Sequence, residues 1–207
     1  MNHLERTFSE SPEASRFARR YLDYLSTILA QLDEEAIVAF IGALVEARER
    51  DASIFFVGNG GSAATASHFA NDIAIGCRSW HKPFRAVSLT DNMPIITAIA
   101  NDYGYEHIFT YQLKTVMKSG DVVVAISASG NSPNVVNALE YANQNGAVSI
   151  ALTGFDGGKL RQVSQINVHV PTEKGEYGPV EDIHMVLDHL VGAFLMYRCR
   201  GEVAVGV

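Results

Sequence analysis

The sequence has little cysteine, little tryptophan and few positive charges. Its 207 residues include 2 Cys and 1 Trp, and 16 Lys plus Arg against 23 Asp plus Glu give a formal net charge of −7. An acidic chain without a cluster of Lys and Arg lacks the positive surface that binds nucleic acids and anionic membranes. We therefore expect neither nucleic acid nor a membrane among its partners.

Long apolar runs are also absent from the sequence. The longest, such as residues 122–126, have the length of a strand, whereas a membrane-spanning helix needs roughly 20 apolar residues. The first residues show no basic segment followed by an apolar core, so we expect no secretory signal. Cys77 and Cys199 are isolated and form no CxxC pair, which is typical of a reducing compartment. Together these features predict a cytoplasmic protein.

The pattern of apolar residues changes once along the chain. Over residues 12–50 they recur at helical spacing, interrupted by the acidic stretch 33–35, which predicts two leading helices. From residue 53 onward, short β-branched runs alternate with helical stretches, which is typical of a parallel sheet covered on both faces. The expected strands are residues 53–57, 84–89, 122–126, 148–152 and 166–170.

These elements predict a single α/β domain over residues 1–207, built as a three-layer, doubly wound, five-stranded parallel sheet. The sheet core is expected over residues 53–170. The last helix is expected over residues 179–198 with Pro179 in its first turn, and residues 200–207 are expected to form a loose tail.

Two strand-to-helix loops form the candidate binding site, because open α/β sheets bind ligands at the carboxyl ends of their strands. The first strand leads into Gly58-Asn59-Gly60-Gly61-Ser62, where glycines permit a tight turn and Ser62 is a suitable helix N-cap. The third strand leads into Ser127-Ala128-Ser129-Gly130-Asn131-Ser132, before a helix that begins with Pro133. Hydroxyls, backbone N–H groups and a helix N-terminus form an anion site without lysine, and a sugar phosphate would fit there.

The first loop also permits a different interpretation. It satisfies the G-x-G-x-x-A pattern of dinucleotide-binding folds, and Asp91 follows the second strand where a ribose-binding acid would stand. Glycine and serine are equally common in turns and helix caps that bind nothing. A lone pattern of this kind is weak, and a dinucleotide leaves the hydroxyl-rich second loop unexplained. We therefore expect no nucleotide cofactor.

These loops belong to a longer set of motifs that resembles the sugar isomerase (SIS) domain, in particular that of bacterial phosphoheptose isomerases. The set also contains Ser67-His68-Phe69-Ala70, residues 97–105, Leu152-Thr153-Gly154 and Glu181-Asp182-Ile183-His184, and the similarity runs in register over residues 20–198. The resemblance implies an enzyme that interconverts sedoheptulose 7-phosphate and D-glycero-D-manno-heptose 7-phosphate through an enediol. It also implies a homotetramer with shared sites, in which the last helix brings Glu181 and His189 to a neighbouring subunit.

Aldose–ketose isomerisation needs a base for a carbon-bound proton and an acid for the oxygens. His68 and Asp72 are four residues apart and share a helix face, whereas the eight residues between Glu181 and His189 correspond to about 80° around the helix axis. The resemblance aligns these residues with catalytic and zinc positions. It implies that Asp72 is the base, that His189 is the acid or its metal-bound partner, and that Zn²⁺ is the cofactor. Two imidazoles and two carboxylates suit zinc, and the implied ligands are His68, Asp72, Glu181 and His189.

The resemblance also implies which residues hold the substrate and where the chain departs from its family. The implied substrate residues are Asn59, Gly60, Gly61, Ser62, Asp102, Ser127, Ser129, Asn131, Ser132 and Glu181. A family glutamate falls on Asp72, a family glutamine on Glu181 and a family acid on Gly178. Another acid of the last helix, Asp188, is expected to be solvated or to accept an N–H bond.

Two alternatives stay open at this point. One is an isomerase of a different phosphosugar, because loop geometry sets the preferred chain length. The other is a non-catalytic SIS-domain regulatory protein that binds another protein, which needs the fold but no acid–base pair. The presence of both carboxylates and both histidines favours an enzyme.

Overall fold

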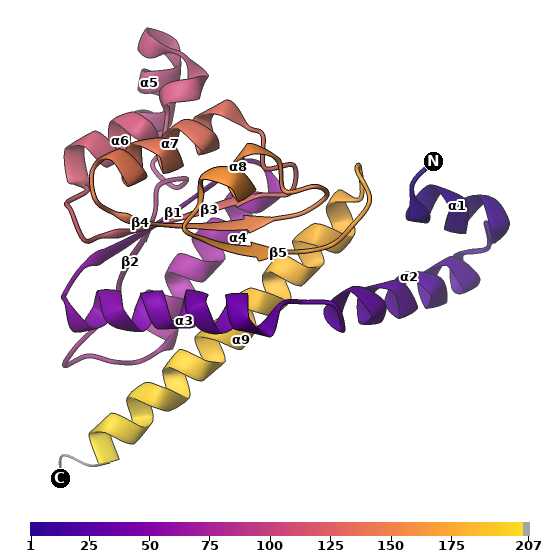
Figure 1. Cartoon of the computed structure of the whole chain (residues 1–207), viewed down its shortest axis with the longest axis horizontal. Helices are drawn as coiled ribbons and strands as arrows, with labels where there is room; N and C mark the ends of the chain where they lie inside the picture. Colours follow the sequence, from indigo (N-terminus) through magenta and orange to yellow (C-terminus); the bar gives the residue numbers. More distant parts are fainter. Residues whose placement is uncertain (205–207) are drawn as a thin grey trace.

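The computed structural model describes residues 1–204, with side chains as far as residue 200. Its sheet has five parallel strands in the order β2-β1-β3-β4-β5, which confirms the predicted fold class (Figure 1). The strands are β1 (Ser53–Gly58), β2 (Arg85–Ser88), β3 (Val122–Ser127), β4 (Val148–Thr153) and β5 (Ile166–His169). Each strand lies within a residue or two of its predicted position, because each is a short apolar run that ends at small or polar residues.

The strand order places the candidate loops next to each other. Strand β1 pairs with β2 on one side and with β3 on the other, with Ile54 opposite Val122 and Gly58 opposite Ile126. In this strand order the connections reverse direction between β1 and β3, and open α/β sheets bind their ligands in the crevice outside the carboxyl ends of the strands at such a reversal. The loops that follow β1 and β3 border this crevice, as the sequence predicts.

Helices cover both faces of the sheet. They are α1 (His3–Glu10), α2 (Ala14–Leu29), α3 (Glu34–Glu49), α4 (Gly61–Asn71), α5 (Met93–Tyr103), α6 (Thr110–Val116), α7 (Pro133–Gln144), α8 (Gly158–Val163) and α9 (Tyr177–Ala204), with a π-helical turn η1 (Asp72–Gly76) and a 3₁₀ turn η2 (Tyr105–His107). Helices α3, α4 and α9 lie on one face, and α6, α7 and α8 on the other (Figure 1).

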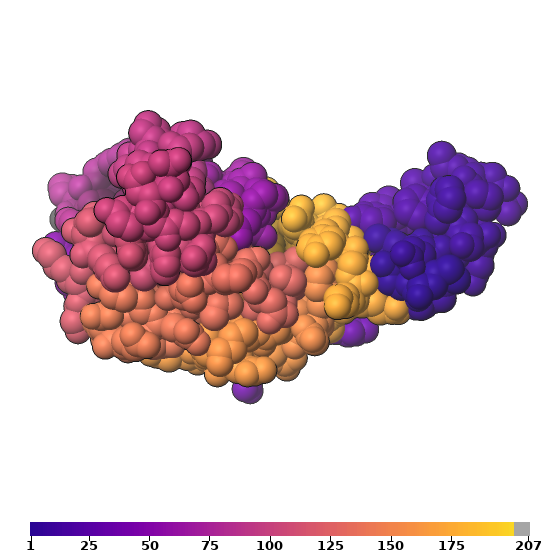
Figure 2. Space-filling model, turned by 90° about the horizontal axis from the view of Figure 1, so that it is seen from above, coloured from indigo at the N-terminus to yellow at the C-terminus, as the bar shows by residue number. Residues whose placement is uncertain are grey.

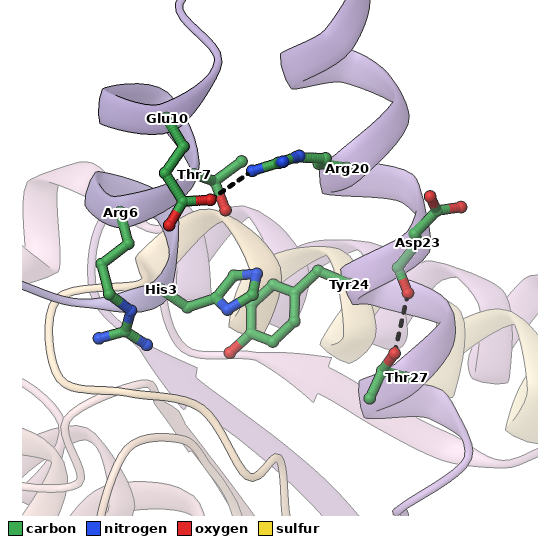
Figure 3. A pocket seen from close by; sticks show the side chains of 8 residues that line it. All are labelled: His3, Arg6, Thr7, Glu10, Arg20, Asp23, Tyr24 and Thr27. Carbon is green, nitrogen blue, oxygen red and sulfur yellow. Dashed lines mark hydrogen bonds and ion pairs between the residues drawn. The ribbon is translucent and has the colours of Figure 1, made fainter.

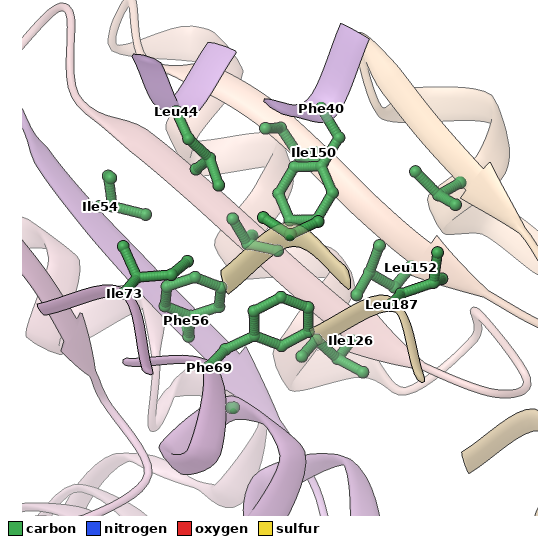
Figure 4. Close-up of a cluster of buried hydrophobic side chains, with 14 of the residues drawn as sticks. Phe40, Leu44, Ile54, Phe56, Phe69, Ile73, Ile126, Ile150, Leu152 and Leu187 are labelled. Carbon is green, nitrogen blue, oxygen red and sulfur yellow. The ribbon is translucent and has the colours of Figure 1, made fainter. Parts of the chain in front are cut away.

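The strands feed two hydrophobic cores because successive side chains point to opposite faces. Ile54 and Phe56 of β1 pack against the side that holds Phe69 of α4 and Leu187 of α9 (Figure 4). Phe55 and Val57, also from β1, pack on the other side with α6 and α7. Burying one such side chain contributes about 1.5–3 kcal/mol, so these two clusters supply much of the driving force for folding.

The N-terminal region contains one helix more than predicted. The two expected helices are α2 and α3, and α1 precedes them with only eight residues. A capping box stabilises this short helix: the side-chain oxygen of Asn2 accepts a hydrogen bond from Glu5 N, and the backbone N–H of Asn2 donates to the Glu5 carboxylate. Helices α1 and α2 form a hairpin that stands out from the body beside the start of α9 (Figures 1 and 2).

Two predicted boundaries differ from the structure. Helix α9 begins two residues before Pro179 and continues to Ala204, so only residues 205–207 of the predicted tail lie outside the described chain. Ser62 is not the N-cap of α4: that position belongs to Gly60, whose φ of 54° suits glycine, and Ser62 is buried in the first turn. Within residues 1–204, none of the helices is both long and apolar enough to span a bilayer.

Candidate functional site

The loop after β1 is tied to the start of α7 by a pair of amides. Asn59 Nδ2 donates to Asn134 Oδ1 at 2.9 Å, and Asn134 Nδ2 donates back to Asn59 Oδ1 at 2.8 Å. The hydroxyl of Tyr105 also donates to Asn59 Oδ1, at 3.1 Å. The sequence singled out Asn59 but neither partner, because only the folded chain brings these segments together. The amide pair fixes the two walls of the crevice relative to each other.

The loop after β3 is folded on itself and on the loop after β4. Ser127 Oγ accepts a hydrogen bond from Gly130 N at 3.2 Å, and Ser129 Oγ accepts one from Asn131 N at 3.3 Å. Gly130 has a φ of 64° and its Cα faces the carbonyl of Gly157 so closely that a Cβ would overlap it. Helix α7 begins at Pro133 as predicted, after Ser132, whose hydroxyl makes no capping bond. That hydroxyl remains available to an anion at the start of α7, where Val135 N already donates to Ser132 O and to Asn134 Oδ1.

Four ionisable side chains from two helices meet beyond the first loop. His68, Asp72, Asp188 and His189 each place a potential ligand atom within 4.8 Å of the others. His68 Nε2 lies 3.4 Å from His189 Nε2, 3.5 Å from Asp72 Oδ2 and 3.7 Å from Asp188 Oδ2. Three of the four predicted metal-site residues are therefore brought together, and Asp188 is the fourth member of this cluster.

A π-helical turn begins at Asp72. Helix α4 ends at Asn71, and the chain continues into η1, whose wider turn begins with Asp72. Such π-helical insertions recur at functional sites because the extra residue redirects a side chain. Helix α9 packs beside this carboxylate: a Cβ built on Gly192 would lie 3.6 Å from Asp72 Cβ, an ordinary van der Waals contact.

Asp188 is fully buried, contrary to the expectation that it is solvated. Neither of its carboxylate oxygens accepts a hydrogen bond from any side chain or backbone group of the described residues. Burial, followed by the charge of Asp72, raises the pKa of Asp188 to about 7. A buried carboxylate without a donor is costly, and a cation held among the two carboxylates and two imidazoles would remove that cost. The donor set and its spacing fit a divalent metal ion.

Glu181 lies elsewhere, at the first loop. Its carboxylate packs so closely on Gly61 that a Cβ at this glycine would overlap it. Burial and then the neighbouring Asp182 raise the pKa of Glu181. The resemblance implies that Glu181 and His189 hold one metal, but the eight residues between them correspond to about 12 Å along the axis of α9. Within one chain, Glu181 faces the candidate substrate loop instead of the metal cluster.

The sequence contained a signal for Asp188 that periodicity could have revealed. The buried face of α9 consists of Val180, Ile183, His184, Leu187, Asp188, Val191, Leu195 and Cys199, which follow helical spacing. An acidic residue within such a stripe is either neutralised or bound to a partner. Asp102, by contrast, is exposed near the end of α5, where its Oδ1 accepts a hydrogen bond from Asn101.

The chain is similar to known proteins along most of its length. The sequence profile of the SIS domain matches residues 16–154. A phosphoheptose isomerase of Geobacter metallireducens is 40% identical over 75% of this chain and 81% of the relative, and one of Aliarcobacter butzleri is 34% identical over 86% and 94%. The structure of a phosphoheptose isomerase from Neisseria gonorrhoeae has 34% identity and a TM-score of 0.73, covering 88% of this chain and 95% of that one. The chain therefore belongs to the SIS domain family and, within it, to the phosphoheptose isomerases.

Proposed function

We propose that this chain is an aldose–ketose isomerase that interconverts sedoheptulose 7-phosphate and D-glycero-D-manno-heptose 7-phosphate. The observation that carries this proposal is the meeting of His68, Asp72, Asp188 and His189 two turns of α4 beyond a glycine-rich loop. The relatives that are named phosphoheptose isomerases supply the identity of the sugar. A carboxylate and an imidazole within reach of one another are the acid–base pair that an enediol mechanism requires.

The isomerisation moves one proton from C1 to C2, adds a proton to O2 and removes one from O1. Asp72 takes a proton from C1 of the open-chain ketose while His189 donates a proton to O2, which gives the enediol. Asp72 then returns its proton to C2, and His189 takes the proton from O1, which gives the aldose. Asp72 and His189 therefore each return to their starting protonation state after one turnover. Asp72 suits the role of base because it is only partly buried, with 27% of its side chain exposed.

Zinc is the metal we assign to the cluster. Ligand atoms about 2.0–2.2 Å from a tetrahedral zinc lie about 3.3–3.6 Å from each other, close to the 3.4, 3.5 and 3.7 Å that separate His68 Nε2 from its three neighbours. His68, Asp72, Asp188 and His189 would hold the ion. Bound zinc would supply positive charge that stabilises negative charge on the sugar oxygens.

The phosphate of the sugar binds at the loops bordering the crevice. The backbone of Gly60 and Gly61 and the hydroxyls of Ser62, Ser127, Ser129 and Ser132 surround the N-termini of α4 and α7, where N–H groups attract an anion. Asn59, Asn131, Asp102 and Glu181 complete the proposed substrate contacts. Because Glu181 packs on Gly61, it faces the sugar rather than the metal.

The active form we propose is a cytoplasmic homotetramer. Four large side chains of α9 are exposed at helical spacing, namely Val186, Leu190, Phe194 and Tyr197. This stripe runs directly beside His189, so a subunit that covers it also covers the metal cluster. A single chain already brings His189 to its own His68 and Asp72, so the neighbour's contribution is to enclose the site rather than to deliver that histidine.

The Asp72→Asn variant tests the proposed base. Product formation from sedoheptulose 7-phosphate, followed by NMR, should fall by at least about 100-fold, since general base catalysis contributes about 10²–10⁴-fold. Binding of the sugar phosphate should stay within a few-fold of the unaltered protein, because the phosphate loops are unchanged. Turnover that persists in this variant would contradict the assignment of Asp72. Sugar-phosphate binding without turnover in the unaltered protein would favour the regulatory alternative or a different phosphosugar.

A further inference from the structure

A cavity lies beside the loop that follows β3. Its volume is about 280 Å³, and its lining combines this loop with the segments after β4 and β5. The lining residues are Ser129, Asn131, Phe155, Asp156, Thr172 and Lys174. Two proposed substrate-binding residues, Ser129 and Asn131, thus share a cavity with a lysine from the connection between β5 and α9, which the sequence did not single out as a binding segment.

Lys174 is the positively charged member of this lining. No carboxylate of the described side chains lies within ion-pairing distance of its ammonium group. Asp156, which shares the cavity, instead accepts a hydrogen bond from Gly158 N at 3.1 Å. A lysine beside a serine hydroxyl and an asparagine amide is a donor set for a phosphate dianion, because all three groups can donate hydrogen bonds.

A buried carboxylate, that of Glu176, anchors the connection that carries Lys174. Glu176 is fully buried and accepts three hydrogen bonds from different parts of the chain. Its oxygens accept hydrogen bonds from Leu4 N of α1 at 3.0 Å, from the hydroxyl of Tyr24 of α2 at 2.6 Å and from Glu173 N at 2.9 Å. Charge-assisted bonds of this kind are roughly twice as strong as neutral ones, so Glu176 fixes residues 173–176 against the N-terminal hairpin.

Further contacts from α1 reinforce the same connection. Arg6 forms an ion pair with Glu173, and a Cβ at Gly175, where φ is 95°, would lie 3.3 Å from the side chain of Asn2. Figure 3 shows Arg6 beside His3, whose ring stacks on Tyr24 with a centroid distance of 3.9 Å. The helix that the sequence did not predict therefore packs against the segment that lines the cavity.

At its other edge the connection is bonded to the loop after β4. Thr172 Oγ1 accepts a hydrogen bond from Phe155 N at 3.2 Å, and Phe155 packs edge-on against Tyr177 at a centroid distance of 5.1 Å. Lys174 thus lies on a segment fixed on one side by Thr172 and on the other by Glu176. A flexible four-carbon side chain on a fixed backbone loses less freedom when it binds than one on a mobile loop.

We propose that Lys174 binds the phosphate group of the substrate and that Glu176 is the residue that positions it at the loop after β3. This inference rests on the proposed function for the identity of the ligand. It adds to that function a cation for the phosphate dianion and a role for α1, which anchors the segment that carries the cation.

Kinetics of single variants with sedoheptulose 7-phosphate test the proposal. Lys174→Ala should raise KM and weaken competitive inhibition by inorganic phosphate by about 10- to 100-fold, as expected for the loss of a charge-assisted hydrogen bond, with kcat changed less than about 2-fold. Lys174→Arg should restore most of the affinity. Lys118→Ala removes an equally exposed positive charge away from the cavity and should change neither constant.

Glu176→Gln tests the positioning role. Alone it should raise KM in the same direction with kcat preserved, and combined with Lys174→Ala it should add little, because the positioned group is already gone. Should Glu176→Gln fail to fold, Tyr24→Phe removes one bond to the same carboxylate and should raise KM to a smaller extent. Additive effects on KM in the double variant would overturn the positioning role.

Direct binding separates this proposal from the proposed function. Titration of inorganic phosphate, followed by phosphorus NMR, measures the site in the full chain whether or not the sugar turns over. Weaker phosphate binding to Lys174→Ala than to the unaltered protein supports the inference even if sedoheptulose 7-phosphate is not the substrate. Equal phosphate binding by the two proteins overturns it, and isomerase activity in both would leave the proposed function intact.

Discussion

Asp188 and Glu181 occupy the same helix, one at the metal cluster and the other at the first loop. Asp188 lies 3.7 Å from His68 Nε2 with no exposed surface, and Glu181 lies against Gly61. An anion buried without donors needs a cation, whereas one at the crevice can accept hydrogen bonds from a ligand. Burial therefore distinguishes the role that we propose for Asp188 from the one that we propose for Glu181.

Asp188→Asn and Glu181→Gln should affect zinc binding differently. The first variant loses a buried anionic ligand and should weaken zinc affinity by at least about 10-fold. Mutations of residues that only hydrogen-bond metal ligands already lower metal affinity by about 10- to 100-fold. The second should bind zinc as the unaltered protein does. Isothermal titration calorimetry with zinc on the metal-free protein measures both. The reverse order of effects would return Glu181 to the ligand set.

The buried His184 makes stability depend on pH. Burial lowers its pKa from 6.5 to about 4, with the Thr153 backbone opposing the shift and His169 adding to it. Between these two values the unfolded chain binds a proton that the native state does not, so the free energy of unfolding falls as pH drops from about 6.5 to 4. The full effect of this residue is on the order of 3 kcal/mol.

Urea unfolding across this pH range measures that dependence. His184→Gln should flatten the slope of stability against pH, whatever its effect at neutral pH. His81→Gln, at an exposed position, serves as the control and should keep the slope. An unchanged slope in His184→Gln would show that other groups control the acid sensitivity.

At the scale of elements, close approach between α4 and α9 builds the site. Gly61 at the start of α4 lies against the carboxylate of Glu181 of α9, and Gly192 of α9 lies in ordinary van der Waals distance of Asp72 at the start of η1. The two helices thus pack together on both sides of the four-residue cluster. A π-helical turn and close packing between helices are tertiary features, and hydrophobic periodicity alone does not predict them.

Gly61→Ala should disturb the contact with Glu181, whereas the same substitution at Gly42 should disturb no contact. The added methyl overlaps the carboxylate of Glu181, whose flexible side chain must then turn away, so we expect a loss of up to about 1 kcal/mol in unfolding free energy, measured by urea denaturation. Glu181→Ala in the same chain should recover most of the loss. Gly42→Ala in α3, where a Cβ meets nothing within 4 Å, should instead stabilise by up to about 1 kcal/mol. Equal effects at both glycines would contradict the contact.

For the whole molecule, the sequence predicts the sheet better than it predicts the site. The strands are readable because buried parallel strands are short apolar runs, and the loop positions follow from strand order. Helix α1 was missed because eight residues with one capping box carry little periodic signal. Asn134 and Lys174 were missed because their partners come from distant segments.

The exposed stripe of α9 predicts an oligomer. Phe194→Glu places a charge in the middle of this stripe and should reduce the particle mass measured by light scattering. Activity should fall with it, because the same surface borders His189. The control Val38→Glu, at an exposed position of α3, should leave the mass unchanged. A fully active monomer would show that the site needs no neighbour.

Proton exchange in heavy water tests the proposed isomerase most directly. The protein is incubated with sedoheptulose 7-phosphate in D₂O, and both sugars are followed by NMR with a chelator, without it, and after zinc is restored. We predict deuterium at C2 of the heptose product, loss of exchange and turnover with the chelator, and recovery with zinc. A protein that binds the sugar phosphate but catalyses neither exchange nor product formation with zinc present would contradict the proposed reaction.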